Sequence, residues 1–269
     1  MVRSVLRPNS GAAGSDNEYQ EDPLFTRSIA RALDVLSAFH YSDRPLSLSE
    51  LAHSAQIDRS AAQRIVHTLR KLGYIRRDEQ GRGFLPGIRT LDHTLDYLRL
   101  HPLVRRATPV LLELRRNVRE RVDLSLFDDL RVVYAARMQS KRETFHATLV
   151  GHSVPTFCSS GGRAILSCLE DAEVADIIAR SDRTPFTPKT LTDPGAIRDK
   201  VAEAREKGYA LTLEEILIGE IAIGIALPDS SGRPCGAIHL AGSLSEWEPE
   251  EFMARFAPLI SEAAADICR

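Results

Sequence analysis

The chain has 269 residues, of which 43% are hydrophobic and 27% are charged. This length and composition are typical of one large or two ordinary globular domains, whose core needs no disulfide or metal to fold. The sequence contains no long apolar run that could span a membrane, and no apolar core follows Arg3 and Arg7, so we expect no secretory signal. The 4 cysteines form no Cys-x-x-Cys pair, which excludes a zinc ribbon, makes a disulfide framework improbable and favours a cytoplasmic location.

The net charge of −2 conceals an asymmetry between the two ends of the chain. Residues 1–120 carry 19 Lys and Arg against 14 Asp and Glu, whereas the remainder carries 16 against 23. This difference favours a polyanionic partner for the first half only. Ordinary solvated surfaces show similar imbalances, so the charge alone leaves both interpretations open.

The first part of the chain changes from polar to periodic. Residues 1–22 are rich in polar side chains without periodicity, which predicts a disordered tail. Apolar residues at helical spacing then predict a helix over 26–40. Its apolar face would hold Ile29, Leu33, Val35, Leu36 and Phe39.

Two further helices and a hairpin are predicted by their end signals. Ser47 and Glu50 form a capping box that opens a short helix over 48–54. Asp58 caps a helix over 59–72, which Gly73 ends. The buried stripe of that helix would hold Ala62, Ile65, Val66, Leu69 and Leu72. Two short strands over 74–77 and 82–85 follow, and this order predicts a winged helix-turn-helix domain over 23–87.

The predicted reader helix leaves polar side chains outside its apolar stripe. Such side chains can donate to phosphates and to base edges in the major groove, and arginines on the hairpin can clamp a phosphate or enter a minor groove. The predicted DNA-binding residues are Arg59, Ser60, Gln63, Arg64, His67, Arg76, Arg77 and Arg82. The alternatives are a solvated helix face and a winged helix used for protein contacts.

The remaining chain mixes helices with strands. Leu91, Leu95 and Leu98 predict a linker helix over 88–101, and another helix follows Pro102. Alternating residues then predict a hairpin over 122–126 and 131–136. Further strands are expected over 145–150, 209–212, 222–228 and 235–241, and helices over 159–169, 171–180, 193–208 and 249–268. This mixture predicts an α+β sensor-like domain over 102–269.

Small residues at 159–162 precede an apolar run. Free backbone amides at such a helix start suit a carboxylate or phosphate, but a glycine-containing start also serves close packing. Spacing alone favours the packing interpretation.

The same segment offers residue types that can serve catalysis or metal binding. Cys158 precedes a helix start, which lowers a thiol pKa, so an enzyme with Cys158 as nucleophile is the alternative function. No Cys/His/Asn arrangement accompanies it, and buried cysteines are commonly apolar filler. A metal at His146, His152 and Cys158 would have non-standard spacing. Neighbouring Glu214 and Glu215 would point to opposite faces of a strand and form no dyad.

The ordered set of segments resembles the IclR family of bacterial transcriptional regulators over residues 24–269. In the first half the resemblance lies at 28–36, 48–52, 60–69, 73–75 and 84–87. In the second half, 159–166 resembles the family's Ser-x-x-Gly-(Lys/Arg)-Ala-x-Leu segment. A Gly-Tyr-Ala triplet at 208–210, followed by Glu214, Glu215 and Gly219, resembles a second family block.

This resemblance implies a fold and partners. The fold would be an N-terminal winged helix-turn-helix domain, a linker helix and a C-terminal GAF-like effector-binding domain. The partners would be double-stranded operator DNA, a small-molecule effector and further copies of the chain, as a homodimer or homotetramer, with no membrane, cofactor or metal. Carried over by position, the effector pocket would involve His146, Val154, Ser160, Gly161, Thr212, Glu220 and Ala222. The backbone amides at 159–162 favour an anion, so the expected effector is a small organic acid, a class that includes aromatic acids.

Overall fold

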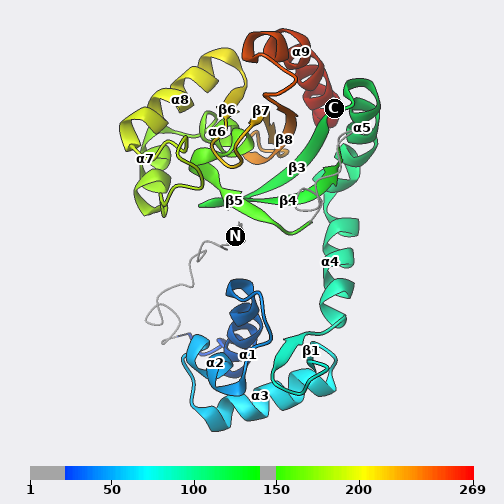
Figure 1. The fold of residues 1–269 in the computed structure, drawn as a ribbon, viewed down its shortest axis with the longest axis vertical. Coiled ribbons are helices and arrows are strands. Elements are labelled where there is room, and N and C mark those ends of the chain that lie inside the picture. Colours follow the sequence, from blue (N-terminus) through cyan, green and yellow to red (C-terminus); the bar gives the residue numbers. More distant parts are fainter. Residues whose placement is uncertain (1–21, 140–149) are drawn as a thin grey trace. The chain divides into compact units, whose positions relative to one another are not determined.

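The computed structural model describes residues 22–139 and 150–269 (Figure 1). The chain divides into two compact units, and the boundary lies between Leu100 and His101. Within the described ranges, no helix combines the length and the apolar character needed to cross a membrane.

The N-terminal unit consists of small helices and a two-stranded hairpin. Its elements are α1 (Arg27–Ser37), the 3-10 turn η1 (Ala38–Tyr41), α2 (Leu48–Ser54), α3 (Arg59–Lys71), β1 (Ile75–Arg77), β2 (Phe84–Pro86) and α4 (Arg89–Leu100). Strands β1 and β2 pair antiparallel. The core of this unit holds Val35, Ala38, Leu46, Leu51, Ala55, Val66, Leu69, Ile75 and Phe84.

Local sequence signals set the ends of α2 and α3, as predicted. Ser47 and Glu50 form the expected capping box, in which each side chain accepts a hydrogen bond from the other residue's backbone amide. The Asp58 carboxylate accepts from the amide of Ala61 at 2.8 Å, and these amides would otherwise lack a partner. Gly73 has φ +82°, a conformation that glycine adopts without strain, so the chain turns there into β1.

The apolar face predicted for α1 is only partly buried. Val35 lies in the core, but Ile29 and Leu33 are 60% and 57% exposed, and Leu72 at the end of α3 is also exposed. Leu36 and Phe39 are partly buried against this core, so the predicted buried face was wrong for Ile29 and Leu33 only. Helix α4 buries no residue at all.

The C-terminal unit is built on a six-stranded sheet. Its strands are β3 (Arg121–Asp128), β4 (Arg131–Met138), β5 (Ser153–Pro155), β6 (Ala210–Leu213), β7 (Glu220–Pro228) and β8 (Pro234–Ser243). Its helices are α5 (Pro102–Val118), the 3-10 turn η3 (Thr156–Cys158), α6 (Ser160–Leu166), α7 (Asp171–Arg180), α8 (Pro194–Lys207) and α9 (Pro249–Cys268).

The sheet has the order β5-β4-β3-β8-β7-β6, and every neighbouring pair is antiparallel. Helices α5 and α9 pack on the face formed by apolar residues such as Leu124, Ile223 and Leu240. Helix α6 packs on the opposite face, against β6, β7 and β8. We call this opposite side the α6 face.

Most elements of this unit match their predicted positions, with three differences. The strand expected over 145–150 lies outside the described residues. Strand β5 was not predicted, because three residues carry too little periodicity. Helix α6 ends at Leu166 rather than near 169, and Ser167 is its C-cap residue.

Candidate functional site

A groove in the N-terminal unit lies between helix α3 and the hairpin. It is lined by Ser47, Leu48, Arg59, Gln63, Val66, His67, Arg70, Arg77, Arg82, Gly83 and Phe84. The helix contributes one wall and the hairpin the other, so residues far apart in the sequence share one basic surface. This arrangement suits a nucleic-acid backbone or groove edge.

The arginines of this surface have no carboxylate partner within the described residues. Arg59 donates to the hydroxyl of Ser49 at 3.0 Å, and Arg77 donates to the carbonyl of Gly81 at 3.3 Å. The Arg77 guanidinium also lies 5.0 Å from the centre of the Phe84 ring. These contacts orient the side chains without neutralising them, so the positive charge faces solvent.

All eight predicted DNA-binding residues are exposed. The groove brings together five of them, which are Arg59, Gln63, His67, Arg77 and Arg82. Ser60 and Arg64 lie on α3 outside the groove lining, and Arg76 lines a second groove beside the start of α4. Arg70 lines both grooves and was not predicted, because it lies in the last turn of α3, beyond the N-terminal end on which the prediction relied.

The α6 face of the C-terminal sheet gathers most of the predicted effector residues. Thr212 pairs with Ala222 across β6 and β7, and Glu220 lies two residues from Ala222 on the same face. Val154 is buried in a cluster with Ile165 of α6. His146 lies outside the described residues, so its position stays a prediction.

Ser160 and Gly161 approach this face from α6. The Ser160 hydroxyl lies 3.2 Å from Nδ1 of His239, and the Ser125 hydroxyl lies 2.7 Å from Nε2 of the same ring. A Cβ on Gly161 would lie 2.2 Å from His239, so only glycine allows this approach. Burial lowers the pKa of His239 to about 4, so the imidazole is neutral at pH 7.

Buried charges on the α6 face were not predicted. Asp123 accepts from Nε of Arg121 at 2.9 Å and from Arg137 at 3.2 and 3.1 Å, and Arg121 also pairs with Glu220 at 2.7 Å. Burial alone would raise the pKa of Asp123, but Arg121 and Arg137 lower it. The alternating pattern of β3 predicted the strand, yet α6 and its neighbours bury the polar side that such a pattern normally exposes to water.

A β-bulge explains why Tyr134 and Arg137 share this face. Residues three apart in a regular strand point to opposite sides, but the pairing of β3 with β4 shifts between Leu124 and Ser125. The Arg137 guanidinium therefore lies 3.9 Å from the centre of the Tyr134 ring. Within the described residues, the Tyr134 hydroxyl has no hydrogen-bond partner.

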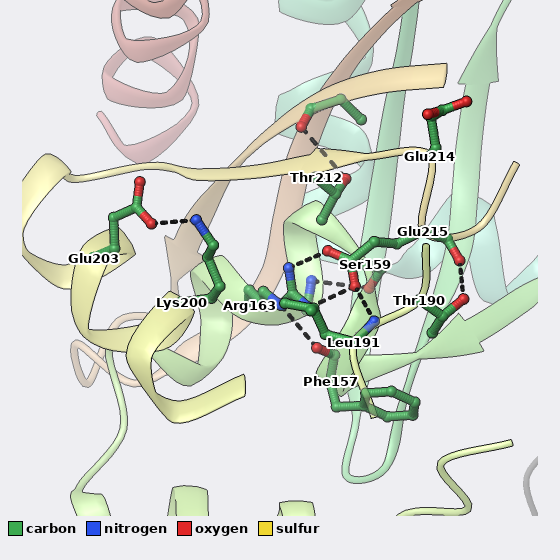
Figure 2. Close-up of polar contacts among 12 residues, drawn as sticks. Phe157, Ser159, Arg163, Thr190, Leu191, Lys200, Glu203, Thr212, Glu214 and Glu215 are labelled. Carbon is green, nitrogen blue, oxygen red and sulfur yellow. Dashed lines mark hydrogen bonds and ion pairs between the residues drawn. The ribbon is translucent and has the colours of Figure 1, made fainter. Parts of the chain in front are cut away.

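An ion pair joins the two C-terminal segments that carry the family resemblance. Arg163 on α6 forms a two-armed pair with Glu215, and both side chains are buried (Figure 2). Glu215 also accepts from the amide of Leu191 at 3.0 Å. Glu214 and Glu215 follow β6 rather than lying within it, so the premise of a shared strand was wrong, and they still form no dyad.

Atoms of Ser159 and Thr156 occupy the space at the start of α6. Ser159 accepts from the amide of Gly162 at 3.2 Å, and a Cβ on Gly162 would lie 2.2 Å from the carbonyl of Thr156. Gly162 thus serves close packing, as spacing alone favoured.

Cys158 is fully buried, and burial raises the pKa of its thiol. A thiolate nucleophile at this position would be costly to form. Within residues 22–139 and 150–269, no group of His, Cys, Asp and Glu side chains is arranged to hold a metal ion.

Comparison with known proteins decides the family. Residues 95–269 match the family described as bacterial transcriptional regulator IclR C-terminal, and residues 28–79 match the IclR helix-turn-helix domain. The chain belongs to the IclR family. It is a ligand-responsive transcriptional regulator with a helix-turn-helix domain for DNA, joined to an α+β domain.

Named relatives and solved structures align with nearly the whole of this chain. The Pca regulon regulatory protein of Pseudomonas putida is 30% identical over 248 residues, covering 92% of this chain and 84% of that protein. An IclR family regulator from Brucella abortus superposes with a TM-score of 0.79 at 22% identity, covering 97% and 98% of the two chains. An IclR homolog from Microbacterium hydrocarbonoxydans, solved with 4-hydroxybenzoate, superposes with a TM-score of 0.72 at 21% identity, covering 89% and 97%.

Proposed function

We propose that this regulator reads operator DNA with α3 and the β1–β2 wing. The residues in contact with DNA would be Arg59, Ser60, Gln63, Arg64, His67, Arg76, Arg77 and Arg82, with Arg70 added by the groove. The observation that supports this most directly is the groove whose arginines lack carboxylate partners among the described residues. Unpaired arginines displace counterions from phosphates, so binding depends on salt.

Salt dependence tests the DNA interface. Anisotropy titrations with the duplex upstream of the protein's own gene are expected to show affinity falling steeply as salt rises. Affinity that does not change with salt would support a protein-binding winged helix instead.

We further propose that a small organic acid, with aromatic acids as the first class to examine, binds the α6 face. The residues would be Val154, Ser160, Gly161, Thr212, Glu220 and Ala222, which α6 and the sheet bring together. The 4-hydroxybenzoate bound by the Microbacterium relative supports this class. The acid would act by binding two arrangements of the protein with different affinity, because equal affinity shifts no equilibrium.

Calorimetry tests the effector class. Wild-type protein is titrated with benzoate, 4-hydroxybenzoate and succinate, and with 4-hydroxybenzamide as a neutral isostere. Binding of an acid, together with a change in operator affinity, is expected. Binding of neutral compounds alone would exclude an acid effector.

The proposed assembly is a homo-oligomer formed through the N-terminal unit. Helices α1 and α4 each carry exposed apolar side chains, and exposed apolar patches mark interaction surfaces in soluble proteins. They are Ile29, Leu33, Leu91, Leu95, Tyr97 and Leu100. Leu95→Glu is expected to shift the mass in sedimentation toward the monomer, whereas Leu217→Glu in the other unit should leave it unchanged.

We propose no catalytic role. The buried thiol of Cys158 speaks against the alternative of an enzyme that uses it as nucleophile.

A further inference from the structure

The α6 face carries a balanced cluster of four charged side chains. Arg121 lies between Asp123 on its own strand and Glu220 on β7, at 2.9 and 2.7 Å. Arg137 on β4 adds a second cation to Asp123 at 3.1 Å. Among the described residues, two cations and two carboxylates thus balance one another, with the neutral imidazole of His239 beside them.

Exposure separates the cluster into an inner and an outer pair. The side chains of Asp123 and Arg137 are 1% and 5% exposed, whereas those of Arg121 and Glu220 are 15% and 16% exposed. Asp123 accepts from both arginines and is therefore held in place. Within the described residues, the Glu220 carboxylate is held by Arg121 alone.

Glu220 also lies at the end of a strand, next to an exposed connection. It is the first residue of β7 and follows the connection 214–219, in which Glu214 and Gly219 have left-handed φ values of 57° and 78°. Leu217 and Ile218 in this connection are exposed. At 16% exposure, the Glu220 side chain already reaches water at this end of β7.

Small side chains lie beside Arg121 on the same face. Thr212, Ala222, Ala241 and Arg121 form one row across β6, β7, β8 and β3. The two alanines leave an apolar floor between a hydroxyl and a guanidinium. An acid with a compact apolar body matches this row, with its carboxylate at the arginine end.

We propose that the effector carboxylate replaces Glu220 on Arg121, so that Glu220 is an exchangeable internal counter-ion and Arg121 is the residue that recognises the acid. This inference rests on the acid effector and the site proposed above. In this inference the acid displaces Glu220 from Arg121, and Glu220 itself does not bind the acid.

Charge balance is the physical reason for exchange rather than addition. A third carboxylate beside the cluster would leave one uncompensated negative charge in a largely buried site, and such a charge is strongly unfavourable. When Glu220 leaves for water, the cluster stays neutral. A neutral isostere cannot displace Glu220, so the site distinguishes acids from amides.

Exchange also provides a route from ligand to conformation. Arg121 ties the start of β7 to β3 through Glu220. Release of Glu220 removes this tie and loosens the connection 214–219, which carries the exposed Leu217 and Ile218. The difference between the acid's binding free energies for the released and the unreleased arrangement is then the coupling free energy available for regulation.

The sign of one substitution tests the exchange. Glu220→Gln removes the competing charge and keeps the size of the side chain, so it is expected to bind an acid of the benzoate, 4-hydroxybenzoate and succinate panel about tenfold more tightly than wild type, as for other close charge pairs. Binding of 4-hydroxybenzamide should not change. Glu214→Gln is the matched control in the same connection, and it should bind acids as wild type does, because Glu214 accepts from the amide of Gly219 instead.

The outcomes separate the two proposals. Equal or weaker acid binding by Glu220→Gln, with wild-type binding intact, would overturn the exchange and leave the acid effector standing. If no acid binds wild type or Glu220→Gln, the acid effector fails and the exchange fails with it. Should Glu220→Gln not fold, Glu220→Ser removes the same charge, and tighter acid binding is again the expected result.

Discussion

The two units of this regulator use arginine in opposite ways. On α3 and the wing, arginines are exposed and lack carboxylate partners among the described residues; they are Arg59, Arg64, Arg70, Arg76, Arg77 and Arg82. In the C-terminal unit, seven of the arginines from β3 to β8 each hold a carboxylate; they are Arg121, Arg131, Arg137, Arg163, Arg180, Arg205 and Arg233.

This difference between the two sets of arginines shows where positive charge is available to a partner. An exposed, unpaired guanidinium keeps its charge for an external polyanion, whereas a paired one contributes to the fold or waits for an anion that can replace its partner. Other arginines of the N-terminal unit, such as Arg44 and Arg89, are paired with Glu50 and Asp92 and lie outside the α3–wing groove. The predicted DNA surface therefore carries only arginines that lack a carboxylate partner among the described residues.

The largest effect on unfolding free energy is expected when a buried ion pair between an arginine and a carboxylate is broken. Glu215→Ala leaves Arg163 buried without its partner, and loss of one member of such a pair costs about 3–5 kcal/mol of unfolding free energy. The single Trp247 lies in the same unit and reports its urea unfolding by fluorescence. Glu214→Ala, next along the chain, should cost no more than about 1 kcal/mol. If Glu215→Ala lowers the unfolding free energy by less than about 1 kcal/mol, the pair has no structural role.

A pH titration sharpens the contrast by using a buried group that stays neutral. His239 has a pKa lowered to about 4 by burial, against an ordinary value of 6.5. The unfolded chain therefore binds a proton before the folded one, so stability is complete above about pH 6.5 and falls as pH decreases toward 4. The loss from this residue sums to about 3 kcal/mol.

The measurement compares urea unfolding of wild type and His239→Gln at several pH values. Glutamine can still hydrogen-bond to Ser125 and Ser160 but does not titrate. The difference between the two proteins should shrink as pH falls from 6.5 to 4. A difference that stays constant with pH would show that His239 is not held neutral by its surroundings.

The smallest of the three effects concerns the unpaired arginines. Arg64→Ala is expected to weaken operator binding by about 1–3 kcal/mol while leaving unfolding free energy nearly unchanged. Arg205→Ala, which removes a surface arginine paired with Asp171, should leave operator binding unchanged. Gel-shift and unfolding measurements on both variants check this, and equal operator affinity for Arg64→Ala and wild type would remove Arg64 from the interface.

Local signals were sufficient for the helix-turn-helix. The capping box of Ser47 and Glu50, the Asp58 cap and the left-handed Gly73 were all predicted and are confirmed. Each depends on residues within four positions along the chain, so their physics is written in the sequence itself. The exposed polar side of α3 followed from the same helical periodicity.

The α6 face could be predicted only in part. The family resemblance pointed to Thr212, Glu220 and Ala222, but not to Asp123 or Arg137. The polar residues of β3 alternate with apolar ones, and such a pattern ordinarily places the polar side in water. A bulge in the pairing of β3 with β4 and the approach of α6 reversed that expectation. Neither feature can be predicted from the local sequence pattern.

The sequence by itself determined most of the helices and strands, where α2 and α3 begin, and that a basic helix is followed by a basic hairpin, because these depend on neighbouring residues and on periodicity. Tertiary structure decided which polar side chains are buried, which arginines are neutralised and which apolar residues on α1 and α4 stay exposed. Those outcomes depend on contacts between residues as distant as Arg121 and Glu220. Only packing sets the local dielectric and the charge partners at such a contact.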